Sequence, residues 1–248
     1  MVQTRLVMVH GLIGSLDYFA PQRLIGSAQV FCCDLLGYGE YRKTPADGLT
    51  LAGQAAHVAA FIERLECGAV WLLGHSMGGA IMMLLAERRP ELVGGIIDVE
   101  GNLTVKDAFW SSRIIAKNPA EWAIEYHAML ADVASTVRKW GVEPTPQRLA
   151  WMEQILRNQP PETLYAMSRA LVAETRAPSY LQAVRRVLDR GHPLHLIAGE
   201  RSAKDWDVPS FVRAAAASYV VQPGTGHLMM FEDPARFCGI VESVLTGT

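Results

Sequence analysis

The chain has 248 residues, half of them hydrophobic, which is enough for one large core or for one core with a lid. Its 23 basic and 25 acidic residues give a net charge of −2 with no long run of either sign, which argues against nucleic acid or an anionic membrane as a partner. No hydrophobic stretch approaches the roughly 20 residues that span a bilayer, and the first apolar run is too short for a signal peptide. We therefore expect a soluble, cytoplasmic protein.

The cysteines and histidines do not predict a metal or another cofactor. The four cysteines lack metal-site spacing, and Cys32 and Cys33 are adjacent inside an apolar run, which favours free, buried thiols. No two histidines have the spacing of a zinc site. The GYG at 37–39 lacks the third glycine and the following helix of a dinucleotide fingerprint.

Short apolar runs alternate with helical patterns in two regions of the chain. The predicted strands are RLVMV (5–9), AQVFCC (28–33), AVWLLGHS (69–76), GIIDV (95–99), PLHLIAG (193–199) and SYVVQPG (218–224). The predicted helices between and after them are TLAGQAAHVAAFIERLE (50–66), MGGAIMMLLAERR (77–89) and DPARFCGIVESVL (233–245). Continuous apolar strands separated by helices indicate an α/β fold with a mostly parallel sheet that is covered on both faces.

An all-helical segment, residues 102–190, interrupts this pattern and contains no convincing strand. Asn118 followed by Pro119 and Glu121 has the form of a capping box, and we expect this helix to end near Gly141. Further helices are predicted to start at Thr145–Pro146, at Pro161 and near Ser179. We interpret 102–190 as a helical cap, or lid, inserted into a core formed by residues 1–101 and 191–248.

The stretch GHSMGG, residues 74–79, has the context of a nucleophile elbow because it follows a predicted strand and opens a helix. Gly74 and Gly78 would leave room for a very tight turn that exposes the Ser76 hydroxyl, and the helix N-terminus would favour developing negative charge there. Backbone N–H groups of Leu12 and Met77 are candidate oxyanion donors. The alternative is a Gly-Ser turn without chemistry.

A serine hydroxyl needs a base, and His227 is the best candidate among seven histidines. It lies in PGTGHLMMFEDP, a loop between the last predicted strand and the last helix. His10 and His75 have structural interpretations, as a loop anchor and as a side chain turned away by the elbow. A structural role at the surface is the alternative for His227.

The segments VHGLIGS, DLLGYGE, GHSMGG and GHLMMFEDP resemble, in order, the landmarks of the α/β-hydrolase family, and they span nearly the whole chain. The resemblance implies that fold with Ser76 as nucleophile, His227 as base, and Leu12 and Met77 as oxyanion donors. The first two family strands are missing before VHG, so we expect a sheet of about six strands. The short start resembles that of plant methylesterases and hydroxynitrile lyases.

The catalytic acid is not at its common family position, because AGERSAKDWD has Ser202 where an Asp is usual. In some members, haloalkane dehalogenases among them, the acid follows the strand after the elbow helix, and this chain has Glu100 there. Asp98 lies two residues earlier and is expected on the same face, but deeper. We predict that Glu100 accepts a hydrogen bond from His227, although Glu100 could instead cap a helix or anchor a loop. The alternative acids are Asp205 and Asp207.

The predicted reaction is hydrolysis of a carboxylic ester or lactone of an apolar small molecule through an acyl-enzyme. The alternatives are carbon–carbon bond hydrolysis or a lyase reaction on the same triad, or a ligand-binding member of the fold without turnover. The candidate pocket residues are Ile13, Trp110, Trp122, Met129, Trp151 and Leu228. Those in the cap have an alternative role, packing its helices together. We expect a monomer or a homodimer, no cofactor, and no partner other than a small-molecule substrate.

Overall fold

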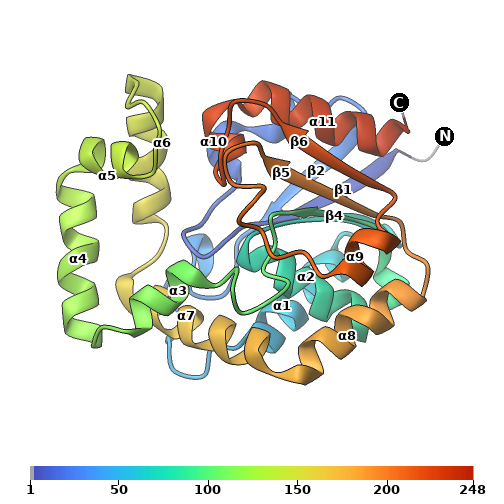
Figure 1. The fold of residues 1–248 in the computed structure, drawn as a ribbon, viewed down its shortest axis with the longest axis horizontal. Helices are drawn as coiled ribbons and strands as arrows, with labels where there is room; N and C mark the ends of the chain where they lie inside the picture. The colour runs from blue at the N-terminus through green and yellow to red at the C-terminus, as the bar shows by residue number, and fades with distance from the viewer. Residues whose placement is uncertain (1–2, 248) are drawn as a thin grey trace.

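A computed structural model describes residues 3–247 as one six-stranded parallel sheet flanked by helices (Figure 1). The strands are β1 (Thr4–Val9), β2 (Ala28–Cys33), β3 (Val70–His75), β4 (Val93–Val99), β5 (Leu194–Gly199) and β6 (Ser218–Gln222). Their order across the sheet is β2-β1-β3-β4-β5-β6, and every neighbouring pair is parallel. The predicted α/β fold with about six strands is confirmed.

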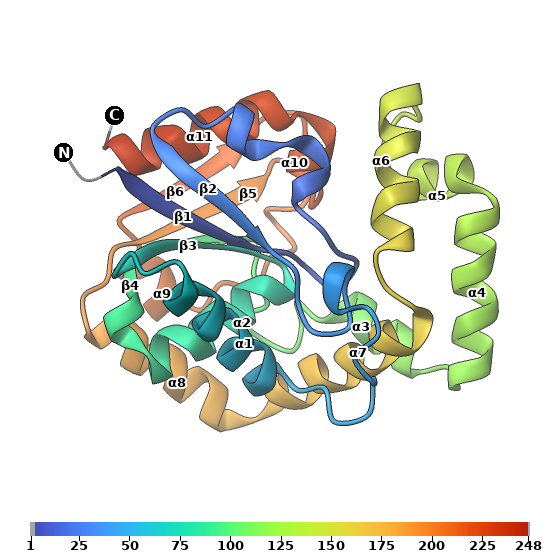
Figure 2. The ribbon, with the colours of Figure 1, turned by 180° about the vertical axis from the view of Figure 1, so that it is seen from behind.

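Alternate residues of each strand are buried on opposite faces of the sheet, which explains why the strands are continuously apolar. Val7 and Val9 pack into the cluster that includes α1 (Leu51–Arg64) and α2 (Met77–Arg88). Leu6 and Met8 pack into a second cluster with α11 (Pro234–Thr246). Figures 1 and 2 show α1 and α2 on one side of the sheet and α11 on the other.

All the regular secondary structure between β4 and β5 is helical, as the sequence predicts. Its helices are α3 (Phe109–Ile115), α4 (Pro119–Ala131), α5 (Val133–Lys139), α6 (Pro146–Arg157), α7 (Pro161–Arg176) and α8 (Pro178–Asp189). The expected capping box of α4 is present, and Thr145 caps α6. The predicted helix up to Gly141 is instead two helices, because the Asp132 side chain accepts from Ser135 N and starts α5.

This helical segment has two parts that lie in different places (Figures 1 and 2). Helices α4, α5 and α6 form a lobe beyond the carboxyl ends of the strands. Helix α8 runs along α2, and Arg190, just after α8, donates to the carbonyl oxygens of Ala86 and Glu87, both at 2.7 Å. The outlying lobe therefore corresponds to α4–α6, whereas α8 belongs to the layer that covers the sheet.

The lobe is fastened to the loop after β1 and to the end of α10 (Met229–Glu232). Gly14 N donates to Oε1 of Gln159 at 3.2 Å, and Asn158 donates to the Gly14 carbonyl. Arg148 on α6 donates to the Glu232 carbonyl at 2.7 Å. The short elements that complete the fold are α9 (Ser210–Ala215) and four 3-10 helices at Asp17–Phe19, Pro21–Arg23, Gly39–Tyr41 and Pro90–Leu92. Within residues 3–247, no helix is both long enough and apolar enough to cross a bilayer.

Candidate active site

Ser76 lies at a sharp turn between β3 and α2, with φ 54° and ψ −120°. A non-glycine residue rarely adopts such a backbone, and it persists only where the surrounding structure imposes it. Close packing imposes it here: a Cβ on Gly74 would lie 2.5 Å from the Gly78 carbonyl oxygen, and a Cβ on Gly78 would lie 2.2 Å from the Val9 oxygen. The two glycines therefore allow α2 to pack directly against β1 and β3, with Ser76 at the helix N-terminus.

Two backbone N–H groups beside Ser76 have no hydrogen-bond partner among the described residues: those of Leu12 and Met77. Met77 is the first residue of α2, where no intrahelical acceptor is available for its N–H. Tyr38 holds the loop that contains Leu12 in place. Its hydroxyl donates to the Leu12 carbonyl at 2.9 Å, and its ring packs edge-on against His10. Two unpaired donors next to a serine hydroxyl are the arrangement that stabilises an oxyanion.

His227 and Glu100 form a hydrogen-bonded pair, with Nδ1 of the imidazole 2.7 Å from Oε2 of the carboxylate. The other carboxylate oxygen accepts from Gly199 N at 2.8 Å and from the Ser202 hydroxyl at 2.6 Å. Ser202, which occupies the common family position of the acid, is thus a hydrogen-bond donor to Glu100, which directly follows the neighbouring strand β4. Because Nδ1 donates to Glu100, Nε2 of His227 is left as an acceptor, as a general base requires.

Asp98 and Glu100 differ in their ionisation. Burial raises the pKa of Asp98 to about 8, because only one of its oxygens has a partner, the Gly101 N–H at 2.8 Å, and Oδ2 has none among the described residues. Burial also opposes ionisation of Glu100, but the bonds and charge of His227, together with Ser202 and Gly199 N, outweigh it and leave the pKa of Glu100 lowered. Neighbouring carboxyl groups with pKa values pushed apart are typical of acid–base sites.

The alternative acids lie elsewhere. Asp205 is exposed and its side chain has no hydrogen bond among residues 3–247. Asp207 accepts from the Thr104 hydroxyl at 2.7 Å and lies 3.5 Å from Nζ of Lys106. Neither carboxylate contacts His227.

His75 supports the loop that carries His227. Its Nε2 donates to the backbone carbonyl of His227 at 2.9 Å, and the two rings lie 4.7 Å apart. Burial, with the charge of His227 nearby, lowers the pKa of His75 to about 3, so the ring is neutral and remains a single donor to that carbonyl. The sequence predicts that His75 turns away from the serine, but it also contributes to the cavity wall.

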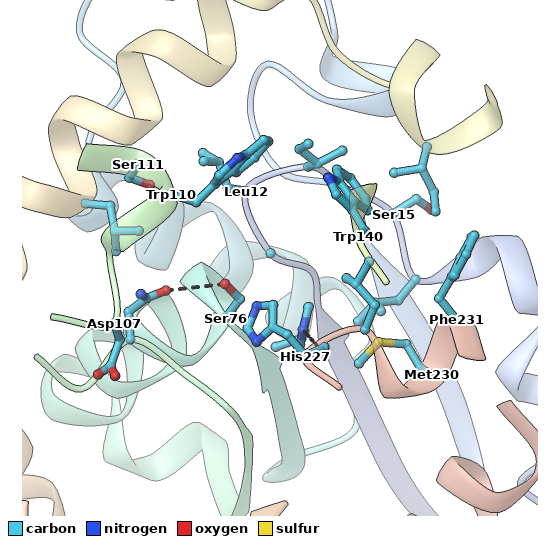
Figure 3. A pocket seen from close by; sticks show the side chains of 18 of the residues that line it. Leu12, Ser15, Ser76, Asp107, Trp110, Ser111, Trp140, His227, Met230 and Phe231 are labelled. Carbon is cyan, nitrogen blue, oxygen red and sulfur yellow. Dashed lines mark hydrogen bonds between the residues drawn. The ribbon is translucent and has the colours of Figure 1, made fainter. Parts of the chain in front are cut away.

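The Ser76 hydroxyl donates to Oδ1 of Asn102 at 3.4 Å (Figure 3). Asn102 is only 3% exposed, and its backbone is fixed by two bonds: its N–H donates to the Ser76 carbonyl, and its carbonyl accepts from Tyr180. The hydroxyl has one proton, so it must leave Asn102 and turn to Nε2 of His227 before His227 can act as a base. Ser76 and His227 line the same cavity.

The cavity above Ser76 has a volume of about 310 Å³, which is in the range of small-molecule sites. Its wall is mainly apolar and comes from the loop after β1, from α3 and the lobe, and from the His227 loop and α10 (Figure 3). Of the six candidate pocket residues, the cavity is lined by Ile13, Trp110 and Leu228. The cavity is also lined by residues that were not predicted from the sequence, among them Tyr18, Asn102, Ser111, Trp140, Met230 and Phe231.

The other three candidates lie behind the cavity wall. Trp122 is buried between helices, with its Nε1 bonded to the Pro161 carbonyl at 3.0 Å, and Met129 packs into the core of the lobe. Trp151 packs against Tyr18 and Phe231, which do line the cavity. Trp122 packs edge-on against the lining residue Trp110, with ring centroids 6.0 Å apart, and α6, which carries Trp151, presents Met152 and Ile155 to the cavity instead. Within residues 3–247, no three His, Cys, Asp or Glu side chains come together as a metal site would require.

Comparisons with known proteins agree with this architecture. The model of the alpha/beta hydrolase family matches residues 6–240. An uncharacterised protein of Mycobacterium tuberculosis (strain ATCC 25618 / H37Rv) is 27% identical over 237 residues, covering 88% of this chain and 68% of that protein. Two solved structures share the fold: an esterase from Exiguobacterium antarcticum (TM-score 0.75, 19% identity, 98% of this chain and 92% of that one) and an N-acyl homoserine lactonase complexed with N-butanoyl homoserine (TM-score 0.69, 20% identity, 98% and 88%). The chain belongs to the alpha/beta hydrolase family.

Proposed function

We propose that the protein is a serine hydrolase that cleaves carboxylic esters or lactones of an apolar small molecule through an acyl-enzyme. The observation that carries the proposal is the convergence of three features on one cavity. A strained, accessible Ser76 faces the cavity, two unpaired N–H groups lie beside it, and the His227 imidazole has its tautomer set by buried Glu100.

In this mechanism the Ser76 hydroxyl turns from Asn102 to His227 and attacks the carbonyl carbon while its proton passes to Nε2. The negative charge that develops on the carbonyl oxygen is bound by the N–H groups of Leu12 and Met77. Collapse of the tetrahedral intermediate breaks the carbon–oxygen bond, and His227 gives its proton to the departing alcohol. Water, deprotonated by the same imidazole, then attacks the acyl-enzyme and releases the carboxylic acid and the free serine.

The size and composition of the cavity support a small, largely apolar substrate. A volume of about 310 Å³ suits a compact ester, and aromatic and aliphatic side chains form most of the wall. The esterase and lactonase among the structural neighbours act on bonds of this type, which also supports the proposal.

The first experiment is labelling with a fluorophosphonate, followed by turnover of p-nitrophenyl esters. We expect stoichiometric labelling that disappears in Ser76→Ala, and ester hydrolysis that disappears with it. Folded protein that is neither labelled nor active would contradict the proposal in favour of a binding protein. Labelling at Ser76 without ester turnover would favour carbon–carbon bond hydrolysis or a lyase reaction.

A further inference from the structure

Two buried polar side chains line the cavity and have donors without a protein partner. Asn102 is 3% exposed, and only its Oδ1 is engaged, by Ser76; its Nδ2 amino group has no hydrogen bond among residues 3–247. Ser111 on α3 is also 3% exposed, and its hydroxyl has no hydrogen bond among the described residues. Nδ2 of Asn102 and Oγ of Ser111 are not among the fully buried atoms without a partner, so both donors are open to the cavity, where a ligand that accepts hydrogen bonds would pair with them.

These donors lie on one side of the nucleophile. In Figure 3, Ser111 and Asp107 lie on one side of Ser76, and His227, Met230 and Phe231 lie on the other. The Ser76–Asn102 hydrogen bond points away from His227 in the same view. The free donors of Asn102 and Ser111 therefore lie in the part of the cavity near α3, whereas the part near α10 is mainly apolar, with Met230 and Phe231 beside Ser15.

The position of His227 determines on which side of the cavity the acyl group of an ester lies and on which side its alcohol lies. The leaving alcohol must reach Nε2 of His227, because that nitrogen returns the proton to it. The acyl group then extends from the carbonyl carbon away from His227, toward Asn102 and Ser111. The distance of 3.4 Å between Ser76 Oγ and Asn102 Oδ1 places the amide beside the first atoms of the acyl group.

The group bound there is uncharged. No lysine or arginine is among the described residues that line the cavity, so an acyl group with a carboxylate would have no cation to pair with. Asp107, which lines the same side, already accepts from the N–H groups of Leu103, Thr104 and Asp207. Its negative charge further disfavours an anionic acyl group.

Resting on the hydrolase function proposed above, we infer that Asn102 and Ser111 form a polar acyl subsite, specific for esters whose acyl group has an uncharged acceptor, such as an amide carbonyl, close to the scissile carbonyl. Buried donors reject the analogue that lacks the acceptor, because that analogue leaves them unpaired. The alcohol part of the substrate lies in the apolar part of the cavity, near Met230 and Phe231.

The test compares two p-nitrophenyl esters of equal chain length, the hexanoate and the N-propanoylglycine ester, which has an amide in place of two methylenes. The readout is kcat/KM for the amide ester divided by kcat/KM for the hexanoate, so that the different chemical reactivity of the esters cancels between variants. We expect this ratio to fall about tenfold in Asn102→Leu and about fivefold in Ser111→Ala, the loss of one hydrogen bond each. Ser112→Ala, a change on the same helix outside the cavity wall, is the matched control and keeps the wild-type ratio.

A binding measurement separates this inference from the proposed function. Both esters are titrated into Ser76→Ala protein, with the fluorescence of Trp110 and Trp140, which line the cavity, as the signal. We expect Ser76→Ala to bind the amide ester more tightly than the hexanoate, and the double variant Ser76→Ala/Asn102→Leu to lose this preference. That result supports the subsite even if the wild type hydrolyses neither ester. Equal affinity for both esters, or ratios unchanged in both Asn102→Leu and Ser111→Ala, would overturn the subsite while leaving ester hydrolysis intact.

Discussion

At the scale of single residues, the end of β4 places two carboxyl groups in opposite charge states. Asp98 is buried with one unpartnered oxygen and favours its neutral form, whereas Glu100 has three hydrogen-bond donors around it and favours its charged form. A neutral Asp98 spares the site a second buried negative charge near the carboxylate of Glu100. Glu100 directs one oxygen, Oε2, to His227 and the other, Oε1, to Gly199 N and the Ser202 hydroxyl.

Replacing Glu100 by Gln is expected to lower kcat for a p-nitrophenyl ester by between about 10²- and 10⁴-fold. The amide removes the charge that stabilises the imidazolium and no longer fixes the proton on Nδ1 of His227. Steady-state kinetics at pH 7.5 would measure the effect, with Asp205→Asn and Asp207→Asn as controls that keep wild-type turnover. Near-native activity in Glu100→Gln, with collapse in either control, would assign the acid to the loop after β5.

Because its pKa is raised, Asp98 makes the free energy of unfolding fall as the pH rises. Because its native pKa of about 8 lies above the ordinary value of 3.8, the native state holds the proton more tightly than the unfolded chain. Its contribution to stability is complete below about pH 4 and is lost as the pH rises toward 8. Asp98→Asn cannot ionise and keeps the acceptor for Gly101 N, so the difference in unfolding free energy between pH 5 and pH 8 should shrink by on the order of a few kcal/mol.

Urea unfolding of wild type and Asp98→Asn at both pH values measures this difference, and the other titrating groups cancel because both proteins contain them. An identical pH dependence in the two proteins would mean that Asp98 is ionised in the native state.

Single-residue roles differ in how far the sequence predicts them. Glu100 was predictable, because Ser202 occupies the common acid position and only a few carboxylates end near the same sheet edge. Asn102 was not, although it is only two residues further on, because its role depends on the Ser76 backbone turn and on a bond from Tyr180. Such contacts between distant segments have no periodic signal in the sequence.

At the scale of elements, apolar continuity predicts the strands and their parallel arrangement, whereas it does not predict the cavity wall. Helical periodicity indicates that Trp122 and Trp140 are at least partly buried, but not that the first packs between helices and the second lines a cavity. The break between α4 and α5 was missed for a related reason: Asp132 starts a new helix with a side-chain bond inside an otherwise continuous helical pattern.

The contact of α2 with β1 gives a prediction at this scale. In Gly78→Ala, the new Cβ would lie 2.2 Å from the Val9 oxygen and 2.7 Å from the His10 oxygen, both backbone atoms that cannot move aside. We expect a loss of about 2–4 kcal/mol in unfolding free energy, or failure to fold. Gly239→Ala is the matched control: it lies on the exposed side of α11 with no atom within 4 Å of its Cβ, and should stabilise by roughly 0.5–1 kcal/mol.

Chemical denaturation of Gly78→Ala, Gly239→Ala and wild type measures these differences in unfolding free energy. Equal stability of Gly78→Ala and wild type would show that the strand and helix can separate at the elbow without cost.

At the scale of the whole molecule, the lobe and the loop after β1 are linked through the side-chain amides of Gln159 and Asn158. Gln159 is 1% exposed; it accepts from Gly14 N and donates to the Tyr126 hydroxyl at 2.7 Å. Gly14 is two residues from Leu12, so the attachment of the lobe and the placement of the Leu12 N–H, the proposed oxyanion donor, share a structural support.

Gln159→Leu should therefore destabilise the protein by about 1–3 kcal/mol, since it leaves the Gly14 N–H buried and unpaired. It should also lower kcat more than it raises KM, because the Leu12 N–H acts mainly on the transition state. Thermal unfolding and ester kinetics on the same preparation measure both effects. Gln22→Leu, which removes an exposed amide bonded only to Asp17 at 3.3 Å, is the control and should change neither.

The position of Glu100, directly after β4, has a further consequence for how such a molecule can change over time. Ser76 and Glu100 belong to one strand–helix–strand unit, with Ser76 N bonded to the Val99 carbonyl at 3.1 Å. Everything between Asn102 and β5 is attached after that unit is complete. A lineage could lengthen, shorten or exchange the intervening helices, and so retune what the enzyme accepts, while the spacing of those two groups stays locked by a pair of adjacent strands.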